Sequence, residues 1–450
     1  MIGSLLDNLK SSLLRFKTDK EYNELIRTSF LALLVRMIGV LTGFFVTLLT
    51  SRFFGADALG LVSICIAILS FASVFGKLGL DVALMKYVAE FAGKSDFASI
   101  KSVYISAMKI ILPVSFLISS ILYFMSGYFA VNILHKPYLE ELLKVNAWLT
   151  LPLVLILVNS ECIRGLKKIR SYTFFQTVSV SLMALVLLII MSFFYSAREI
   201  PTYIQFFSIA FTGLLSLMMW FYYSKFFKEK SANEFPASTL MRTSSSMFFT
   251  TLMQLIMSWA GTLILAAYNS EADVGVYNAL VRISVFTNIT ILAINSLAMP
   301  RFAEAFALGK LDVLKKHSIE VSRLIFITSI PAFILLTIFP EWILSIFGKE
   351  FPGNEAALYV LLAGQFIVAI TGLPSQILNM TGRQHILRNI AFFSAIVNVI
   401  ACIILVPLYG IMGTCIAQFA GIFAWNLLSI FSVKNHFGFF TFFNPFAKNT

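Results

Sequence analysis

Long apolar runs separated by short polar segments repeat along the whole chain. Each run holds about 20 residues, the length at which a helix rising 1.5 Å per residue crosses the ~30 Å hydrocarbon core of a bilayer. The pattern therefore predicts an all-α polytopic membrane protein with about twelve transmembrane helices. The predicted spans are residues 29–50, 58–80, 103–126, 142–160, 172–195, 202–224, 247–268, 275–298, 321–343, 357–379, 390–409 and 411–433.

The composition agrees with this pattern. Hydrophobic residues make up 59% of the 450 residues and charged residues only 12%, and the mean hydropathy is +0.87, which excludes a soluble globular domain. The first 28 residues carry scattered charges and no compact apolar run, so we expect a cytoplasmic amphipathic segment there rather than a signal peptide. The four cysteines lie in or at the ends of apolar runs without paired spacing and are expected to be core residues.

Basic residues fall mostly on one side of the predicted topology. With the N-terminus inside, the cytoplasmic segments hold 26 of the 34 Lys and Arg residues. Because positively charged loops stay in the cytoplasm, both termini are predicted to lie inside. The same asymmetry explains the net charge of +12 without a nucleic-acid partner. The basic residues predicted in outer loops are Arg52, Lys136, Arg198 and Lys349.

The second half of the chain repeats the first at a nearly constant offset of 214 to 217 residues. ADALGLV at 56–62 matches ADVGVYN at 272–278 and pairs Gly60 with Gly275, and further along RGLKKIR matches TGRQHIL. Such matches in order, at one spacing, indicate a duplication of six helices. Two bundles with an even number of helices are related by a pseudo-twofold axis along the membrane normal, and transporters built this way hold their site between the halves.

The duplication sets the expected domain organisation. We expect a cytoplasmic amphipathic N-terminus at 1–28, an N-terminal six-helix bundle at 29–224, a cytoplasmic linker at 225–246, a C-terminal six-helix bundle at 247–433 and a cytoplasmic tail at 434–450. Prolines occur in corresponding spans of the two halves. They either mark interrupted helices beside the transport site or are tolerated kinks. These prolines are Pro113 with Pro331 and Pro152 with Pro374.

The charges well inside the predicted spans share one sign. They are Arg36 in the first helix, Lys109 in the third and Arg282 in the eighth, and no acidic residue lies in the middle of a span. An arginine at the centre of a membrane helix costs ~2.5 to 3.5 kcal/mol, so it is expected to face a wet cavity or a partner. The three cations are predicted to line a positive path, although Lys109 has the alternative of snorkelling to the cytoplasmic surface.

Polar residues extend this candidate site. On a continuous eighth helix, Asn278, Asn288 and Asn295 share with Arg282 a face of about 140°, which is expected to line the cavity. Glutamines of the seventh and tenth helices, Gln254, Gln365 and Gln376, either extend this lining or form hydrogen bonds between helices. A cavity lined by cations without carboxylates is expected to select a large anion. The predicted substrate-binding residues are Arg282, Arg36, Lys109, Asn278 and Gln254.

At this point the chain resembles a known family over nearly its whole length. The resemblance rests on the twelve spans, the duplication, the AD motif and its glycine before the second helix of each half, the AE pairs at Glu90 and Glu304, and the glycine loops at Gly165 and Gly382. These features look like the polysaccharide-biosynthesis flippases, the O-antigen or Wzx-type translocases of the multidrug/oligosaccharidyl-lipid/polysaccharide exporter superfamily. The resemblance implies movement of an undecaprenyl-pyrophosphate-linked oligosaccharide across the bacterial inner membrane, through a cationic lumen.

Other function classes fit the sequence less well. An organic-cation exporter of the same superfamily is expected to use carboxylates within the membrane, and a membrane enzyme of polysaccharide assembly needs a sizeable outer loop. Motifs for zinc hydrolysis and for the nucleotide phosphate loop are missing. We therefore expect a transporter that is not an enzyme and has no cofactor. Its expected partners are the lipid-linked anionic oligosaccharide, membrane lipids and other polysaccharide-assembly proteins.

Overall fold

The computed structural model describes residues 20–228 and 235–442, and these ranges contain helices and turns but no strand. Backbone groups in hydrocarbon must be hydrogen-bonded within the protein, which helices achieve along each apolar run. The α-helices are α2 (Lys20–Lys77), α3 (Leu80–Gly93), α4 (Phe97–Tyr128), α5 (Leu139–Trp148), α6 (Thr150–Gly165), α7 (Ile169–Thr173), α8 (Ser179–Met191), α9 (Ile200–Tyr223), α10 (Ala237–Tyr268), α11 (Glu271–Phe286), α12 (Thr290–Ala307), α13 (Leu311–Ile338), α14 (Pro340–Phe347), α15 (Glu355–Thr371), α16 (Pro374–Met380) and α17 (Gln384–Phe437). Two π-helical turns, Phe129–Ile133 and Phe174–Val178, complete the set.

These helices account for twelve membrane spans. Within the described part of the chain, seven helices are long and apolar enough to cross a bilayer, and two bent pairs raise the number of candidates to nine. Two of the seven contain two spans each, because α2 has a non-helical residue at Gly55 and α17 has one at Gly410. Helices α11 and α12 together form the remaining span. The predicted all-α fold of two six-helix bundles is confirmed.

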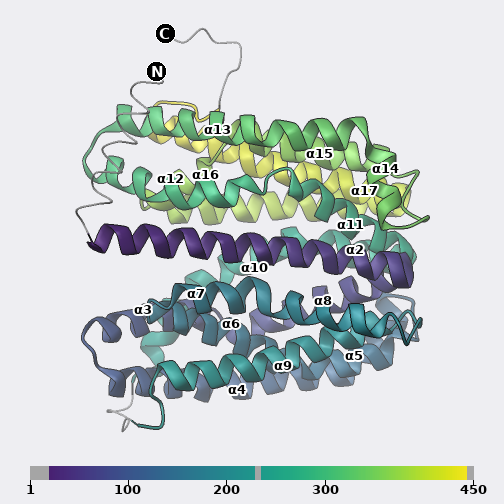
Figure 1. The fold of residues 1–450 in the computed structure, drawn as a ribbon, viewed down its shortest axis with the longest axis horizontal. Helices are drawn as coiled ribbons and strands as arrows, with labels where there is room; N and C mark the ends of the chain where they lie inside the picture. The colour runs from purple at the N-terminus through teal and green to yellow at the C-terminus, as the bar shows by residue number, and fades with distance from the viewer. Residues whose placement is uncertain (1–19, 229–234, 443–450) are drawn as a thin grey trace.

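The two bundles lie side by side with α2 and α10 between them (Figure 1). The first bundle comprises α2 to α9 and the second α10 to α17. One buried apolar cluster, which includes Phe302 and Leu373, belongs to the second bundle alone. The largest cluster takes residues from both, including Leu61 of the first bundle and Tyr277 of the second. A shared apolar core therefore joins the bundles.

Equivalent spans of the two bundles are interrupted. The fourth span bends by 40° between α5 and α6, and the tenth by 49° between α15 and α16. Pro152 lies in the first turn of α6, and Pro374 begins α16 after Gly372 with φ of +72°. Proline suits a first helical turn because its missing N–H needs no partner there. The predicted interruption is therefore present in these two spans, whereas Pro113 and Pro331 lie within α4 and α13.

The eighth span is also broken, which the sequence pattern did not predict. Helix α11 ends at Phe286 and α12 begins at Thr290. In the intervening turn, the N–H groups of Thr287, Asn288 and Ile289 bond to carbonyl oxygens three residues earlier, as in a tighter 3₁₀ turn. The predicted continuous helix over 275–298 is therefore wrong, and the residues on either side of the turn do not share one helical face.

Helix ends differ from the predicted spans near the linker and the tail. Helix α10 begins at Ala237, within the predicted linker 225–246, directly after Pro236. The end of α17 is followed by a packed segment in which the Thr441 carbonyl accepts a hydrogen bond from Ser322 Oγ (2.7 Å). Residues 1–19, 229–234 and 443–450, which hold most of the predicted N-terminal segment and parts of the linker and tail, lie outside the described residues.

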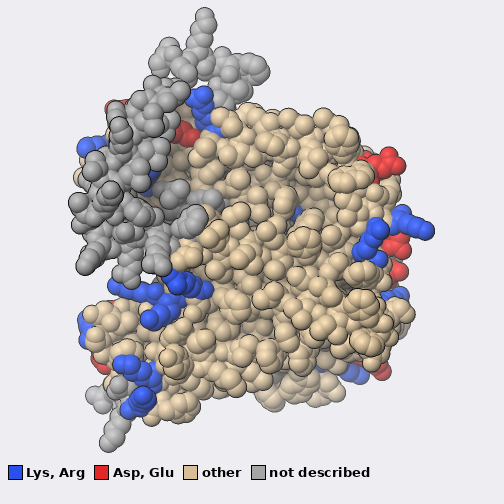
Figure 2. All heavy atoms as spheres, in the orientation of Figure 1, with Lys and Arg blue, Asp and Glu red and all other residues tan. Residues whose placement is uncertain are grey.

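Charged side chains gather at the two ends of the molecule. Figure 2 shows Lys and Arg clustered at the end that carries α3, α7 and α16, whereas the middle of this face is almost uncharged. We call this the basic end; its residues include Lys167, Lys168 and Arg170. At the opposite end, which carries α5 and α14, acidic and basic side chains are mixed.

Candidate functional site

Arg282 lies on α11, a helix whose start is fixed by a capping box. The Ser270 hydroxyl accepts a hydrogen bond from the Asp273 N–H (3.2 Å), and the Asp273 carboxylate accepts one from the Ser270 N–H (3.2 Å). Arg282 follows about three turns later. Its guanidinium lies against Gly43 of α2, where a Cβ would be 3.5 Å from Nη2. Arg282 therefore lies where the second bundle meets the first.

The Arg282 side chain is exposed although it lies between the two bundles. Protein atoms nevertheless surround its guanidinium. Among the residues that the structure describes, Arg282 has no hydrogen-bond or ion-pair partner. A guanidinium offers five donors in a planar fork that matches phosphate oxygens. The site has the chemistry to bind an anion.

Asn278 and Gln254 lie on the helices around Arg282. Asn278 is one turn earlier on α11, where its Nδ2 donates to the Val274 carbonyl (2.9 Å) and its Oδ1 accepts from Thr262 Oγ1 of α10 (3.3 Å). These bonds tie α11 to α10. Gln254 is exposed on α10. The role of both residues in substrate binding stays a prediction.

Asn288 does not belong to the Arg282 face, so this part of the prediction is wrong. It is buried, and its Nδ2 donates to Gln365 Oε1 (2.9 Å) of α15 while its Oδ1 accepts from Ser329 Oγ (3.1 Å) of α13. The turn after α11 rotates the chain and directs Asn288 into the second bundle. Of the two interpretations of Gln365, hydrogen bonding between helices is therefore the correct one for this contact.

The other predicted cations lie against different parts of the first bundle. Arg36 is exposed on α2, a helix that packs against α7. Lys109 is exposed on α4 and, with Ser106 and Phe235, lines a cavity of about 390 Å³ beside the start of α10. The continuous positive path from Arg36 and Lys109 to Arg282 stays a prediction.

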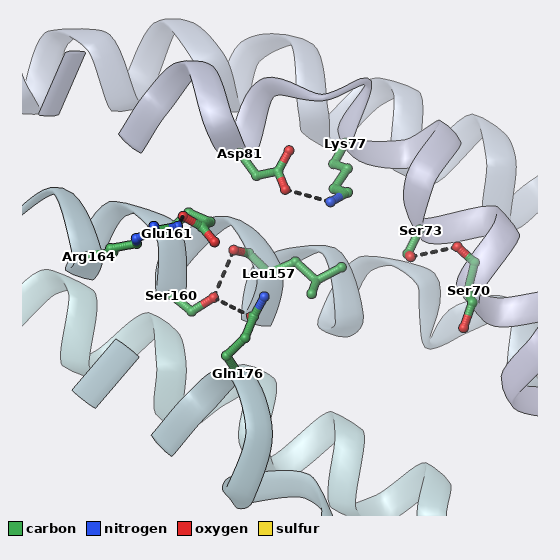
Figure 3. Close-up of polar contacts among 9 residues, drawn as sticks. All are labelled: Ser70, Ser73, Lys77, Asp81, Leu157, Ser160, Glu161, Arg164 and Gln176. Atoms are coloured by element: carbon green, nitrogen blue, oxygen red, sulfur yellow. Dashed lines mark hydrogen bonds and ion pairs between the residues drawn. The ribbon is translucent and has the colours of Figure 1, made fainter. Parts of the chain in front are cut away.

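Sequence reasoning missed a group of four charges in the first bundle, three of which are buried while Arg164 is exposed. Lys77 and Asp81 are only 7% and 6% exposed, and the Lys77 Nζ lies 2.5 Å from the Asp81 carboxylate. On α6, Glu161 is 7% exposed, and its carboxylate lies 3.3 Å from Arg164 Nη1. Figure 3 shows these two pairs near one another, with a hydrogen bond from Ser160 to Gln176 beside them. We call the four charged residues the N-bundle charge cluster.

Lys77 is one of the 26 basic residues that the sequence assigns to the cytoplasmic side, and the structure shows that it is buried there. The turn after α2 ends the helix at Lys77 and returns the chain into the bundle as α3, so Lys77 is enclosed. Because the turn between α2 and α3 separates Lys77 from Asp81, the helical spacing of four residues does not identify this pair from the sequence. Each carboxylate of the cluster has a basic partner, which leaves the cluster with no net formal charge. The described part of the chain contains no group of three or more His, Cys, Asp or Glu side chains that could hold a metal ion.

Comparison with family models decides the family. The model described as "Polysaccharide biosynthesis protein" matches residues 25–306, which is more than half of the chain. The chain belongs to the polysaccharide biosynthesis protein family. A second model, MatE, matches residues 246–404 of this family member, a range that lies within the second bundle. The resemblance found in the sequence is confirmed.

Two relatives of this polysaccharide biosynthesis protein are archaeal. An uncharacterized membrane protein of Methanocaldococcus jannaschii is 23% identical over 405 residues, covering 83% of this chain and 76% of the relative. The "Probable low-salt glycan biosynthesis flippase Agl15" of Haloferax volcanii is 27% identical over 168 residues, covering 36% of this chain and 34% of that protein.

Solved structures share the fold of this family member. An inward-facing multidrug resistance MATE family transporter of the MOP superfamily has a TM-score of 0.72 at 14% identity, covering 90% of this chain and 94% of that one. The lipid II flippase MurJ in an inward closed conformation has a TM-score of 0.71 at 16% identity, covering 91% and 87%. Both are membrane transport proteins, which agrees with a multi-pass membrane protein built from two six-helix bundles.

Proposed function

We propose that this chain is a flippase that moves an undecaprenyl-pyrophosphate-linked oligosaccharide, an O-antigen repeat unit or a similar glycan precursor, across the cytoplasmic membrane by alternating access. The observation that carries the proposal is Arg282: a deep, accessible guanidinium without a carboxylate partner among the described residues, placed against Gly43 where the bundles meet. The family and the flippases among its relatives and structural neighbours support it.

The proposed substrate has three chemically distinct parts. The pyrophosphate is anionic and accepts charge-assisted hydrogen bonds from a guanidinium. The oligosaccharide is polar and needs a wet passage between the bundles. The polyprenyl tail can stay in lipid at an opening between them. Arg282 supplies the anion site in this scheme, and Asn278 and Gln254 supply neutral hydrogen bonds beside it.

The orientation follows from the basic end. We infer that the basic end is cytoplasmic, because positive loops are retained there, and we call the opposite end the outer end. Arg36 and Lys109 then lie on the cytoplasmic side of the passage, where they attract the pyrophosphate before it reaches Arg282. Movement of negative charge outwards is favoured by an inside-negative potential by ~2.3 kcal/mol per charge per 100 mV.

Reconstitution in liposomes tests the transport proposal. Leaflet exchange of a labelled polyprenyl-pyrophosphate oligosaccharide is compared between wild type, R282A, R282K and the control R388A, which removes an exposed arginine at the start of α17. We expect R282A to abolish exchange, R282K to retain part of it and R388A to match wild type. Equal exchange by R282A and wild type would move the anion site elsewhere, and failure of wild type itself would reject the flippase proposal.

Imposed gradients test the energy source separately. If charge movement drives transport, an inside-negative potential set across the liposome membrane accelerates export without a proton or sodium gradient. A rate that responds to an ion gradient but not to the potential would replace this scheme with antiport.

A multidrug or organic-cation exporter is the second candidate, because the MatE model matches residues 246–404. The structure adds Asp81 and Glu161 as buried carboxylates, which such an exporter would need. Both have a basic partner, Lys77 and Arg164, and this favours the anionic substrate. Export of a fluorescent organic cation by wild type and by R282A at equal rates, without exchange of the lipid-linked oligosaccharide, would support the exporter instead.

A further inference from the structure

The bundles meet at the outer end through a reciprocal pair of glycines. A Cβ on Gly60 of α2 would lie 1.9 Å from the Glu271 carbonyl oxygen, and a Cβ on Gly275 of α11 would lie 2.0 Å from the Ala56 carbonyl oxygen. No real side chain tolerates such distances, so this contact requires glycine at both positions. Gly60 and Gly275 are the paired glycines of the repeated AD motif. Each copy of the repeat therefore presents its glycine to the helix start of the other copy.

A loop of the first bundle reinforces this contact. Lys136, between the third and fourth spans, is 9% exposed, and its Nζ donates to the carbonyl oxygens of Ala266 (2.9 Å) and Asn269 (2.5 Å) at the end of α10. The same Nζ lies 3.3 Å from the Glu271 carboxylate, which also accepts a hydrogen bond from the Tyr138 hydroxyl. A cation at the carbonyl end of a helix is favourable because of the helix dipole. Lys136 therefore holds the turn between the seventh and eighth spans.

The equivalent region of the second bundle holds the turn between the first and second spans. The Glu350 carboxylate, between the ninth and tenth spans, accepts a hydrogen bond from the Ala56 N–H (2.8 Å). Arg52, at the end of the first span, donates to the carbonyl oxygens of Ser345 (3.2 Å) and Ile346 (3.3 Å). Each bundle thus contacts the turn between the first two spans of the other bundle. The first bundle does so with a base, Lys136, and the second with an acid, Glu350.

The basic end lacks a comparable reciprocal contact among the described residues. Its contacts between bundles come mainly from the first part of α10, where a Cβ on Gly79 would lie 2.7 Å from the Ser244 carbonyl oxygen. The Tyr87 hydroxyl lies 3.2 Å from Thr243 Oγ1 in the same region. Among the described residues, the two ends are therefore joined in different ways, and both copies of the repeat make equivalent contacts at the outer end alone.

We propose that these outer contacts form a single gate, the outer clasp, made of Gly60, Gly275, Lys136, Glu271, Arg52 and Glu350. The clasp holds the outer end shut and must open as a unit before substrate leaves. The inference rests on the proposed alternating access. Helix α11 carries Glu271 and Gly275 at its start and Arg282 in its body, and it ends at the break after Phe286. The anion site and the gate thus share one rigid helix, which can tilt at that break.

Distances between spin labels test the clasp without any substrate. One pair of labels is placed at the outer end, on Ser196 of the first bundle and Glu341 of the second, and another at the basic end, on Lys168 and Gln384; all four are exposed. The four native cysteines are buried, and the chain without added cysteines serves as the blank. Pulsed electron–electron double resonance then reports the population of open and closed outer ends for wild type, K136M, G60A and G275A.

We expect each clasp variant to raise the ratio of outward-open to closed molecules about tenfold or more, because it leaves a buried acid without its base or forces a Cβ against backbone. The basic-end pair is expected to shorten in the same samples. K144M is the matched control for K136M, since Lys144 pairs with Glu140 of its own helix at 38% exposure of both side chains. G93A is the control for the glycines, because a Cβ there meets nothing within 4 Å.

Distance distributions in folded K136M that match those of wild type and K144M would overturn the clasp. K136M keeps the test decisive if the glycine variants do not fold. Since the distances are measured without transport, failure of R282A to affect exchange in liposomes would reject the proposed anion site and leave the clasp standing. If the spin-label distances are unchanged while R282A abolishes exchange in liposomes, the clasp is rejected and the anion site stands.

Discussion

The N-bundle charge cluster and Arg282 place charge within the protein in opposite ways. In the cluster, Lys77 and Asp81 are buried and lie 2.5 Å apart, and Glu161 has Arg164 as its partner. Arg282 is accessible and has no partner among the described residues. Both regions contain cations that hydropathy alone treats alike. The difference teaches that a partner, rather than depth, distinguishes a charge that supports the fold from one available to a ligand.

The largest expected effect comes from removing one half of the buried pair. D81N leaves the Lys77 charge buried and uncompensated, which is expected to cost ~3–5 kcal/mol of unfolding free energy. The measurement is chemical unfolding of the protein in detergent micelles. E90Q is the matched control. Glu90 of α3 pairs with Lys94 at the end of that helix, but the side chains of Lys94 and Glu90 are 63% and 49% exposed. Equal destabilisation by D81N and E90Q would show that the pair is not a buried structural element.

A second variant tests whether Asn288 has a structural role that differs from that of Arg282 in the same span. N288A removes hydrogen bonds to Gln365 and Ser329 and leaves the buried Ser329 hydroxyl without a partner, which is expected to cost ~1–3 kcal/mol of unfolding free energy. Pyrophosphate affinity is expected to stay within about twofold of wild type, since sites without shared partners act independently. A large loss of affinity with unchanged stability would return Asn288 to the substrate site.

Substitution of Gly43 tests whether a ligand reaches the Arg282 guanidinium. G43L is expected to cover the Arg282 guanidinium and lower pyrophosphate affinity about tenfold, which corresponds to ~1.4 kcal/mol. G43A is expected to bind normally, because its Cβ would be in ordinary contact with Nη2 at 3.5 Å. G93L, on an open surface, is the control for the added side chain. Affinities of G43L equal to those of G93L would argue against access to Arg282 past Gly43.

The smallest effect concerns Asp57 at the outer end, just before the second span. Burial, with Glu350 and Glu271 nearby, raises the pKa of its carboxyl above 3.8, while Arg198 opposes the shift. The folded protein therefore holds the proton more tightly than the unfolded chain. Stability contributed by this group is expected to fall as pH rises from 3.8 through the folded pKa, and to change no further above it. The unfolding free energies of wild type and D57N are measured at several pH values. D57N should lack the part of the pH dependence that Asp57 contributes, and an equal pH dependence of the two proteins would contradict the raised pKa of Asp57.

Periodic hydrophobicity and the repeat were sufficient for the fold, because a bilayer imposes the same length on every span. They also singled out Arg282 and the pairing of Gly60 with Gly275. The break after Phe286 was missed because the turn contains neither glycine nor proline: Thr287, Asn288 and Ile289 follow the helix without a local signal. The burial of Lys77 was not predicted because it depends on the packing of α3 against the bundle, which a short-range pattern does not encode.

Direct binding of a short polyprenyl pyrophosphate to the purified protein tests the central claim most closely. Titration calorimetry in detergent would compare wild type, R282K and R282Q, with unfolding curves recorded on the same samples. The account predicts that R282Q loses at least about tenfold in affinity, that R282K loses less, and that neither loses stability, because hydrogen bonds from a charged donor contribute about 1.5–3 kcal/mol. Equal affinity of wild type and R282Q would contradict the account.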